Sequence, residues 1–128
     1  MPAVASRPAG SRAGTLHTLP SQAERHLSVC RALVPSDRTV AEILGVSPSQ
    51  VSRWKRGQDP GDENADRLGG LALVVEMLAR WLPAEAVEGW LQGRNAHFGE
   101  RSPAQMIRSG RVADVIGAIE AEKAGVFA

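Results

Sequence analysis

Apolar residues recur along most of the chain at the three- and four-residue spacing of amphipathic helices, and no stretch alternates with period two for long enough to predict a strand. Ser21 and Glu24 form a capping box that predicts a helix to about Val34, where Pro35 breaks the pattern. A short helix fits residues 38–44. The next begins at SPSQ (47–50), where serine caps, proline takes the first helical position and glutamine completes the box. The pattern predicts an all-α fold.

The second half of the chain continues the helical pattern. A long helix is expected over 63–82; its apolar residues cover more than one face, so we expect it between the two halves or in a dimer contact. Pro83 opens a further helix to Gln92, followed by a loop over 93–101. SPAQ (102–105) then repeats the capping signature. Helices fit 103–109 and 111–124, separated by Gly110, and Gly125 is placed as a C-terminal cap.

Residues 38–57 carry the pattern of a helix-turn-helix. Ala41 is the small residue where the helices cross, Gly45 supplies the turn, and an apolar set that includes Val51 and Trp54 locks the second helix onto the first. The opposite face of that second helix has no carboxylate and two guanidiniums, which can bind guanine or phosphate. Its start also favours an anion. The predicted DNA-binding residues are Ser47, Ser49, Gln50, Ser52, Arg53 and Arg56.

The alternative is a helical hairpin whose arginines merely solvate its surface. The repeated start at 102–105 acts as an internal control, because its helix has Arg108 as the single charge and lacks the Arg/Ser face. The helix over 103–109 is therefore expected to pack against the rest of the protein rather than to bind in a DNA groove.

Charge is divided unevenly along the chain, whose formal net charge is +1. Residues 1–60 contain eight Lys and Arg against four Asp and Glu, whereas residues 61–128 contain seven against ten. The positive charge of the first half favours binding of a polyanion, and the negative charge of the second half indicates that the polyanion does not touch it. Chance segregation of charge in a short chain is the alternative. Residues 1–20, rich in Pro, Ala, Ser, Gly and Arg, are expected to form a flexible arm.

Candidate chemistry outside the helix pair is sparse. The single cysteine, Cys30, predicts a small core residue in a reducing compartment, and no signal peptide or membrane span is recognisable, so we expect a cytoplasmic protein without membrane contact. The histidines at 17, 26 and 97 share no metal-ligand spacing. We therefore expect no catalytic residue, no metal and no cofactor. Trp81 and Trp90 are interpreted as core or interface anchors rather than a ligand box.

The second half also carries a resemblance. Its pattern runs Trp90-Leu91, Asn95, Phe98-Gly99, Ser102-Pro103, Gly110, Val115, Ile119 and Gly125-Val126-Phe127-Ala128. This order resembles the C-terminal domain of the Xre–MbcA–ParS antitoxins, and the resemblance covers about residues 21–128. It implies an Xre-like helix-turn-helix (21–62), a central helix for dimerisation (63–82) and a small helical toxin-binding domain with a C-terminal tail (83–128).

The resemblance implies a specific function. The partners of this family are type II toxins with a RES domain, which consume NAD, and the antitoxin covers their NAD-binding cleft. Family members dimerise and repress their own operon, although some branches lose DNA binding; we accordingly expect operator DNA and a homodimer as further partners. The implied toxin-binding residues are Arg94, Asn95, His97, Phe98, Arg101, Gly125, Val126, Phe127 and Ala128.

Three alternatives stay open. A stand-alone dimeric repressor would use its C-terminal helices only for dimerisation, and an adaptor without DNA binding would result from an inert arginine face. The apolar tail could also fold back on its own last helix.

Overall fold

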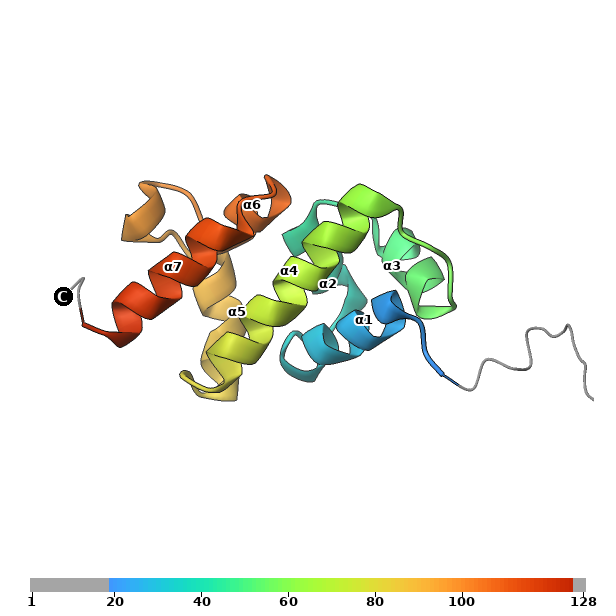
Figure 1. The fold of residues 1–128 in the computed structure, drawn as a ribbon, viewed down its shortest axis with the longest axis horizontal. Coiled ribbons are helices and arrows are strands. Elements are labelled where there is room, and N and C mark those ends of the chain that lie inside the picture. Colours follow the sequence, from blue (N-terminus) through green and yellow to red (C-terminus); the bar gives the residue numbers. More distant parts are fainter. Residues whose placement is uncertain (1–18, 126–128) are drawn as a thin grey trace, which may run out of the picture.

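The computed structural model describes residues 19–125 (Figure 1). Most of the predicted arm, residues 1–18, and the predicted tail residues Val126, Phe127 and Ala128 lie outside the described residues. Across 19–125 all regular secondary structure is helical and there is no strand, so the all-α prediction is confirmed. The elements are α1 (Gln22–Leu33), α2 (Asp37–Leu44), α3 (Pro48–Lys55), α4 (Asp62–Ala79), α5 (Ala84–Gln92), the 3₁₀ helix η3 (Ala96–Phe98), α6 (Pro103–Arg108) and α7 (Val112–Lys123).

The helix starts are the best-predicted local features. Capping boxes are present at Ser21, Ser47 and Ser102, each with the serine hydroxyl accepting from the third helical amide and the Glu or Gln side chain accepting from the serine amide. Gly45 and Gly125 end their helices with positive φ values of 75° and 73°, the left-handed conformation that glycine adopts without a Cβ clash.

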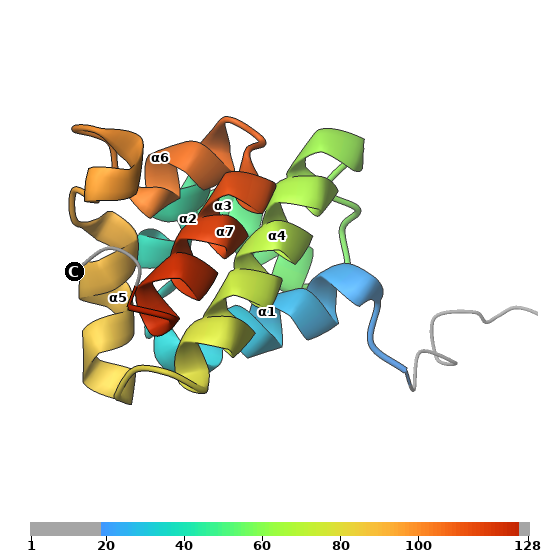
Figure 2. The same ribbon diagram turned by 60° about the vertical axis from the view of Figure 1, so that its left-hand side comes forward.

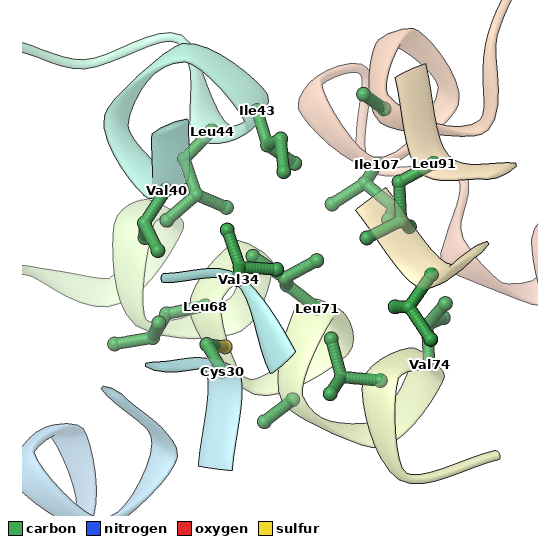
Figure 3. Packing of buried hydrophobic residues seen from close by; sticks show 14 of the residues in the cluster. Cys30, Val34, Val40, Ile43, Leu44, Leu68, Leu71, Val74, Leu91 and Ile107 are labelled. Carbon is green, nitrogen blue, oxygen red and sulfur yellow. The ribbon is translucent and has the colours of Figure 1, made fainter. Parts of the chain in front are cut away.

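Helix α4 forms the centre of the molecule. It packs against α1 on one side and α7 on the other (Figures 1 and 2), and so lies between the two halves, one of the two placements expected from the sequence. Its buried residues Leu68, Leu71, Val74, Val75 and Leu78 belong to one continuous hydrophobic cluster. Figure 3 shows that cluster running from Cys30 and Leu44 in the first half to Leu91 and Ile107 in the second. The two halves therefore share a single core.

The predicted end of α4 was wrong by three residues. The helix stops at Ala79, and Trp81 and Leu82 form a turn whose amides donate to the carbonyl of Leu78. Pro83 explains the early stop, because its ring disfavours the helical conformation in the preceding residue. The 3₁₀ turn within 93–101 was not predicted, and the remaining helix ends agree to within about a residue.

Two further observations concern the core and the membrane. Cys30 is completely buried, as predicted, and desolvation raises the pKa of its thiol to about 12, so it stays protonated. Among the helices of residues 19–125, none is long and apolar enough to span a bilayer.

Candidate functional site

The predicted helix-turn-helix is α2, the turn at Gly45, and α3. Ala41 is buried at the crossing, and the amide of Val46 donates to its carbonyl at 3.0 Å, which closes the turn. Val51 and Trp54 are buried and fix α3 against α1 and α2. The packing that the sequence predicted for this pair is therefore present.

The outward face of α3 carries the two predicted arginines. Arg53 and Arg56 are exposed, and Ser49 beside them is exposed as well. The Nε of Arg53 donates to the side-chain oxygen of Gln58 at 2.9 Å, and Arg56 donates to the hydroxyl of Ser52 at 2.8 Å. Both guanidiniums are thus oriented by neighbours and keep further N–H groups for a ligand.

Ser47 and Gln50 have a different role from the arginines. Gln50 accepts from the Ser47 amide at 2.9 Å, and the Ser47 hydroxyl accepts from the Gln50 amide at 3.2 Å. These side chains are engaged in building the start of α3. We therefore assign them to helix capping, and a direct contact with DNA stays a prediction for them.

A partly buried carboxylate connects α3 to the two preceding helices. Asp37, at the start of α2, forms ion pairs with Arg31 of α1 and, at 2.9 Å, with Lys55 of α3. The cluster ties all three helices together. Lys55 is therefore a structural cation rather than part of the candidate DNA-binding face.

The two halves meet at the turn of the helix pair. Arg108, the last residue of α6, donates from Nε to the carbonyl of Ile43 in α2 at 3.1 Å. Its Cδ lies so close to Gly45 that a Cβ at that position would be 2.7 Å away. Arg108 was interpreted from sequence as an isolated charge on a packing helix; the structure shows that it supports the turn.

The predicted toxin-binding loop has a defined internal structure. The amide of Asn95 donates to the carbonyl of Arg101 at 3.0 Å, and its side-chain oxygen accepts from the His97 amide at 2.9 Å, which starts η3. Gly99 has a φ of 71° and returns the chain. Asn95 is 9% exposed. We therefore assign Asn95 to shaping the loop, and its direct contact with a toxin stays a prediction.

Glu122 of α7 connects this loop to the helices. Its carboxylate accepts from the Trp90 indole at 3.2 Å and from the Asn95 side-chain amide at 3.1 Å. The Nε2 of His97 lies 3.7 Å from the same carboxylate. Trp90 also meets Trp81 edge to face, with ring centroids 6.4 Å apart. The tryptophans are thus anchors at the edge of the core, as interpreted from sequence.

A groove of about 460 Å³ lies beside the loop. It is lined by His97, Phe98, Arg101, Met106, Arg111, Ala113, Asp114, Gly117 and Ala118. Arg101 is exposed at its edge, whereas Arg111 is ion-paired with Asp114 at 2.7 Å. Arg94 lies outside the lining and forms a fully solvated pair with Glu100 at 2.6 Å. An exposed pair of this kind contributes little to stability, so Arg94 is free to exchange partners.

The structure thus brings together three of the predicted toxin-binding residues, His97, Phe98 and Arg101, along one groove. Gly125 lies at the end of α7, and the other tail residues lie outside the described residues. Sequence reasoning missed Gln58, Arg108 and Glu122. Arg108 and Glu122 contact residues far away in the sequence, and Gln58 lies beyond the end of α3; none of the three stands in a recognisable motif.

Metal binding has no candidate within residues 19–125, where no group of three or more His, Cys, Asp or Glu side chains is placed to hold an ion. The described surfaces offer hydrogen bonds and charge from α3, and a shaped groove with a flanking arginine in the second half.

Comparison with curated proteins decides the family. The chain is 37% identical to the mycobacterial cidal antitoxin MbcA of Mycobacterium tuberculosis strain H37Rv over 89 residues, which is 69% of this chain and 79% of the relative. The MbcA of Mycobacterium bovis matches to the same extent. The chain belongs to the MbcA antitoxin family. No protein-family model matches the sequence.

Solved structures support the family assignment over both halves. A chain of the crystal structure of the M. tuberculosis MbcT–MbcA toxin–antitoxin complex superposes with a TM-score of 0.74 at 32% sequence identity. The match covers 86% of this chain and all of that chain. The structural match therefore extends over both the helix-turn-helix half and the α5–α7 half.

Proposed function

We propose that this protein is the antitoxin of a toxin–antitoxin pair and that it neutralises its toxin by direct binding. The observation that carries the proposal is the 37% identity to MbcA, together with the structural match to a chain of the MbcT–MbcA complex. The match extends over nearly the whole described chain. A relative that shared only a DNA-binding module would match the first half alone.

The toxin-binding surface is assigned to the second half. The loop between Arg94 and Arg101 is held in one shape by Asn95, and the groove beside it carries both apolar and cationic side chains. In the interpretation from sequence, residues 125–128 form a second toxin-binding segment with an apolar end. A preformed loop loses little conformational entropy on association, which favours tight binding.

The toxin is proposed to be a RES-domain protein that consumes NAD, and the antitoxin to occlude its NAD-binding cleft. The support is the resemblance described above and the charge of the second half. An acidic surface complements a cleft that must attract the anionic pyrophosphate of NAD.

Operator binding through α3 is proposed as a second role. Arg53 and Arg56 lie exposed on one face with Ser49, and the described part of α3 carries no carboxylate. This arrangement also suits a stand-alone repressor, so DNA binding alone does not distinguish the two functions.

A homodimer that forms through α4 is proposed as the assembly that presents two copies of α3 to DNA. Leu73 is 44% exposed in the middle of α4 although its neighbours on the helix are buried. If two copies cross antiparallel at Leu73, Asp66 of one lies opposite Arg80 of the other, and both residues are exposed. A Leu73→Glu variant is expected to elute as a monomer in light-scattering chromatography, and an unchanged mass would exclude this face.

Co-expression tests the antitoxin function directly. The protein is expected to co-purify with the product of the neighbouring reading frame and to suppress its consumption of NAD, with M. tuberculosis MbcT as a second toxin. A chain lacking residues 125–128 is expected to lose neutralisation while its DNA affinity changes little. Full neutralisation by the shortened chain would contradict the role of the tail. Failure to bind either toxin, combined with a specific gel shift, would favour the stand-alone repressor.

A further inference from the structure

The end of α2 has a buried backbone carbonyl whose donor comes from the other half of the molecule. Ile43 is completely buried, and the last carbonyls of a helix have no amide partner within it. The amides of residues 45–47, which join α2 to α3, donate to other acceptors: the carbonyls of Glu42 and Ala41 and the side chain of Gln50. The Ile43 carbonyl accepts instead from Nε of Arg108 in α6, at 3.1 Å.

Arg108 contacts the turn through its stem as well as through its guanidinium. A Cβ placed on Gly45 would lie 2.7 Å from Cδ of Arg108 and 3.1 Å from Cγ, so the stem lies directly over the glycine. The last turn of α2 contains no basic residue of its own, and a cation is favourable at the negative end of a helix dipole. Arg108 therefore serves as a C-terminal cap of α2, although it belongs to α6.

We propose that Arg108 is a positioning residue for DNA binding by α3. Without its donor, the Ile43 carbonyl would be left unsatisfied in the interior, or the turn would have to open toward water. Only residues 45–47 separate the end of α2 from the start of α3, so a shift of this turn moves the first residues of α3 directly. This inference rests on the proposed binding of operator DNA by α3.

The second half thereby contributes to operator recognition without a contact to DNA of its own. A helix held in one orientation has less freedom to lose on association than a helix that follows a loose turn. Hydrogen bonds to base edges depend on distance and angle and carry the sequence information, whereas attraction between cations and phosphates tolerates small shifts. Affinity for a specific site is therefore expected to depend on Arg108 more than affinity for arbitrary DNA.

Two neutral substitutions separate the hydrogen bond of Arg108 from its charge. Arg108→Gln places an N–H donor at the position of the arginine Nε, whereas Arg108→Met keeps methylene groups over Gly45 and has no donor. Both variants lose one positive charge, so each is the matched control of the other. Fluorescence anisotropy measures the affinity of the full-length proteins for the DNA upstream of their own reading frame, and for a scrambled duplex of equal length at the same salt concentration.

The donor is expected to matter for the upstream DNA alone. Arg108→Met is expected to bind it roughly tenfold more weakly than Arg108→Gln, while the two variants bind the scrambled duplex within about twofold of each other. Equal affinity of the two variants for the upstream DNA would overturn the proposal, and equal weakening of both relative to the wild-type protein would indicate a direct contact of the guanidinium with phosphate. If the wild-type protein does not prefer the upstream DNA, the proposed operator binding itself fails.

Hydrogen exchange on the DNA-free full-length proteins locates the effect. Arg108→Met is expected to accelerate exchange of the amides of residues 45–51 by roughly tenfold relative to Arg108→Gln, because the turn opens locally. The amides of residues 115–119, in the middle of α7, are expected to exchange at the same rate in both variants. Acceleration over both segments would show a loss of global stability and would refute a local positioning role.

Discussion

Helices α3 and α6 begin with nearly the same four residues, SPSQ and SPAQ, and with the same capping box, yet they lie in opposite surroundings. In α3 the buried residues are Val51 and Trp54, and its arginines face solvent. In α6 the start itself is buried, together with Met106 and Ile107. A cap therefore specifies where a helix starts, while the residues that follow specify whether it faces a partner or the core.

The largest expected difference between the two helices is in stability. Ile107→Ala removes a fully buried side chain of α6 and is expected to lower the free energy of unfolding by about 2–5 kcal/mol. Arg53→Ala on α3 is expected to change it by less than about 0.5 kcal/mol. Chemical denaturation of both variants measures the two values. A comparable loss in both would contradict the assignment of α3 as the exposed helix.

DNA affinity, unlike stability, is expected to depend strongly on the exposed arginines of α3. Arg53→Ala with Arg56→Ala is expected to weaken operator binding by roughly a hundredfold or more, and to reduce the slope of log affinity against log salt by about two if both contact phosphates. Fluorescence anisotropy over a salt series on the protein's upstream DNA measures both quantities. Arg94→Ala with Arg101→Ala removes equal charge from the other half and serves as the control. Equal weakening by the two double variants would indicate a nonspecific charge effect.

The turns that follow α2 and α6 sharpen the comparison further. Gly45 and Gly110 have nearly the same positive φ, 75° and 78°, but a Cβ at Gly45 would meet Arg108 whereas one at Gly110 would meet nothing within 4 Å. Gly110→Ala is expected to cost about 1–2 kcal/mol from backbone strain alone. Gly45→Ala is expected to cost more, because Arg108 must move.

Thermal or chemical unfolding measures the loss of stability in each glycine variant. Repeating both measurements in the Arg108→Ala background completes a double-mutant cycle. In the Arg108→Ala background the two alanine substitutions are expected to cost nearly the same. A persistent excess at Gly45 would show that the clash is with another group.

The smallest expected difference is in how much the two serine caps contribute to the free energy of unfolding. Ser47→Ala and Ser102→Ala each remove one hydroxyl acceptor and are expected to cost about 1 kcal/mol. The loss at Ser102 should be the greater, because that residue is 7% exposed and water cannot replace the hydroxyl there. Urea midpoints of the two variants rank them. The reverse order would show that water reaches the start of α6.

Sequence periodicity and caps were sufficient to predict the helices and the buried residues around Ala41, Val51 and Trp54. These features depend on residues only a few positions apart. The arginine face of α3 was predictable for the same reason. The role of Asn95 was not, because its burial depends on Glu122, which lies 27 positions later. Arg108 acts 65 positions away on Ile43. Contacts at such separations leave no local pattern.

The single core around α4 has a consequence for how this protein can change over evolution. Because one hydrophobic cluster lies behind both the groove and α3, we expect the two ends of the molecule to unfold together, so that a substitution weakening either end lowers the folded population available to both. A lineage that does not use the proposed operator binding could lose Arg53 and Arg56 at little cost, but it could not discard α1–α3, which contribute to the shared core. The first half would persist as scaffold after its own task had gone.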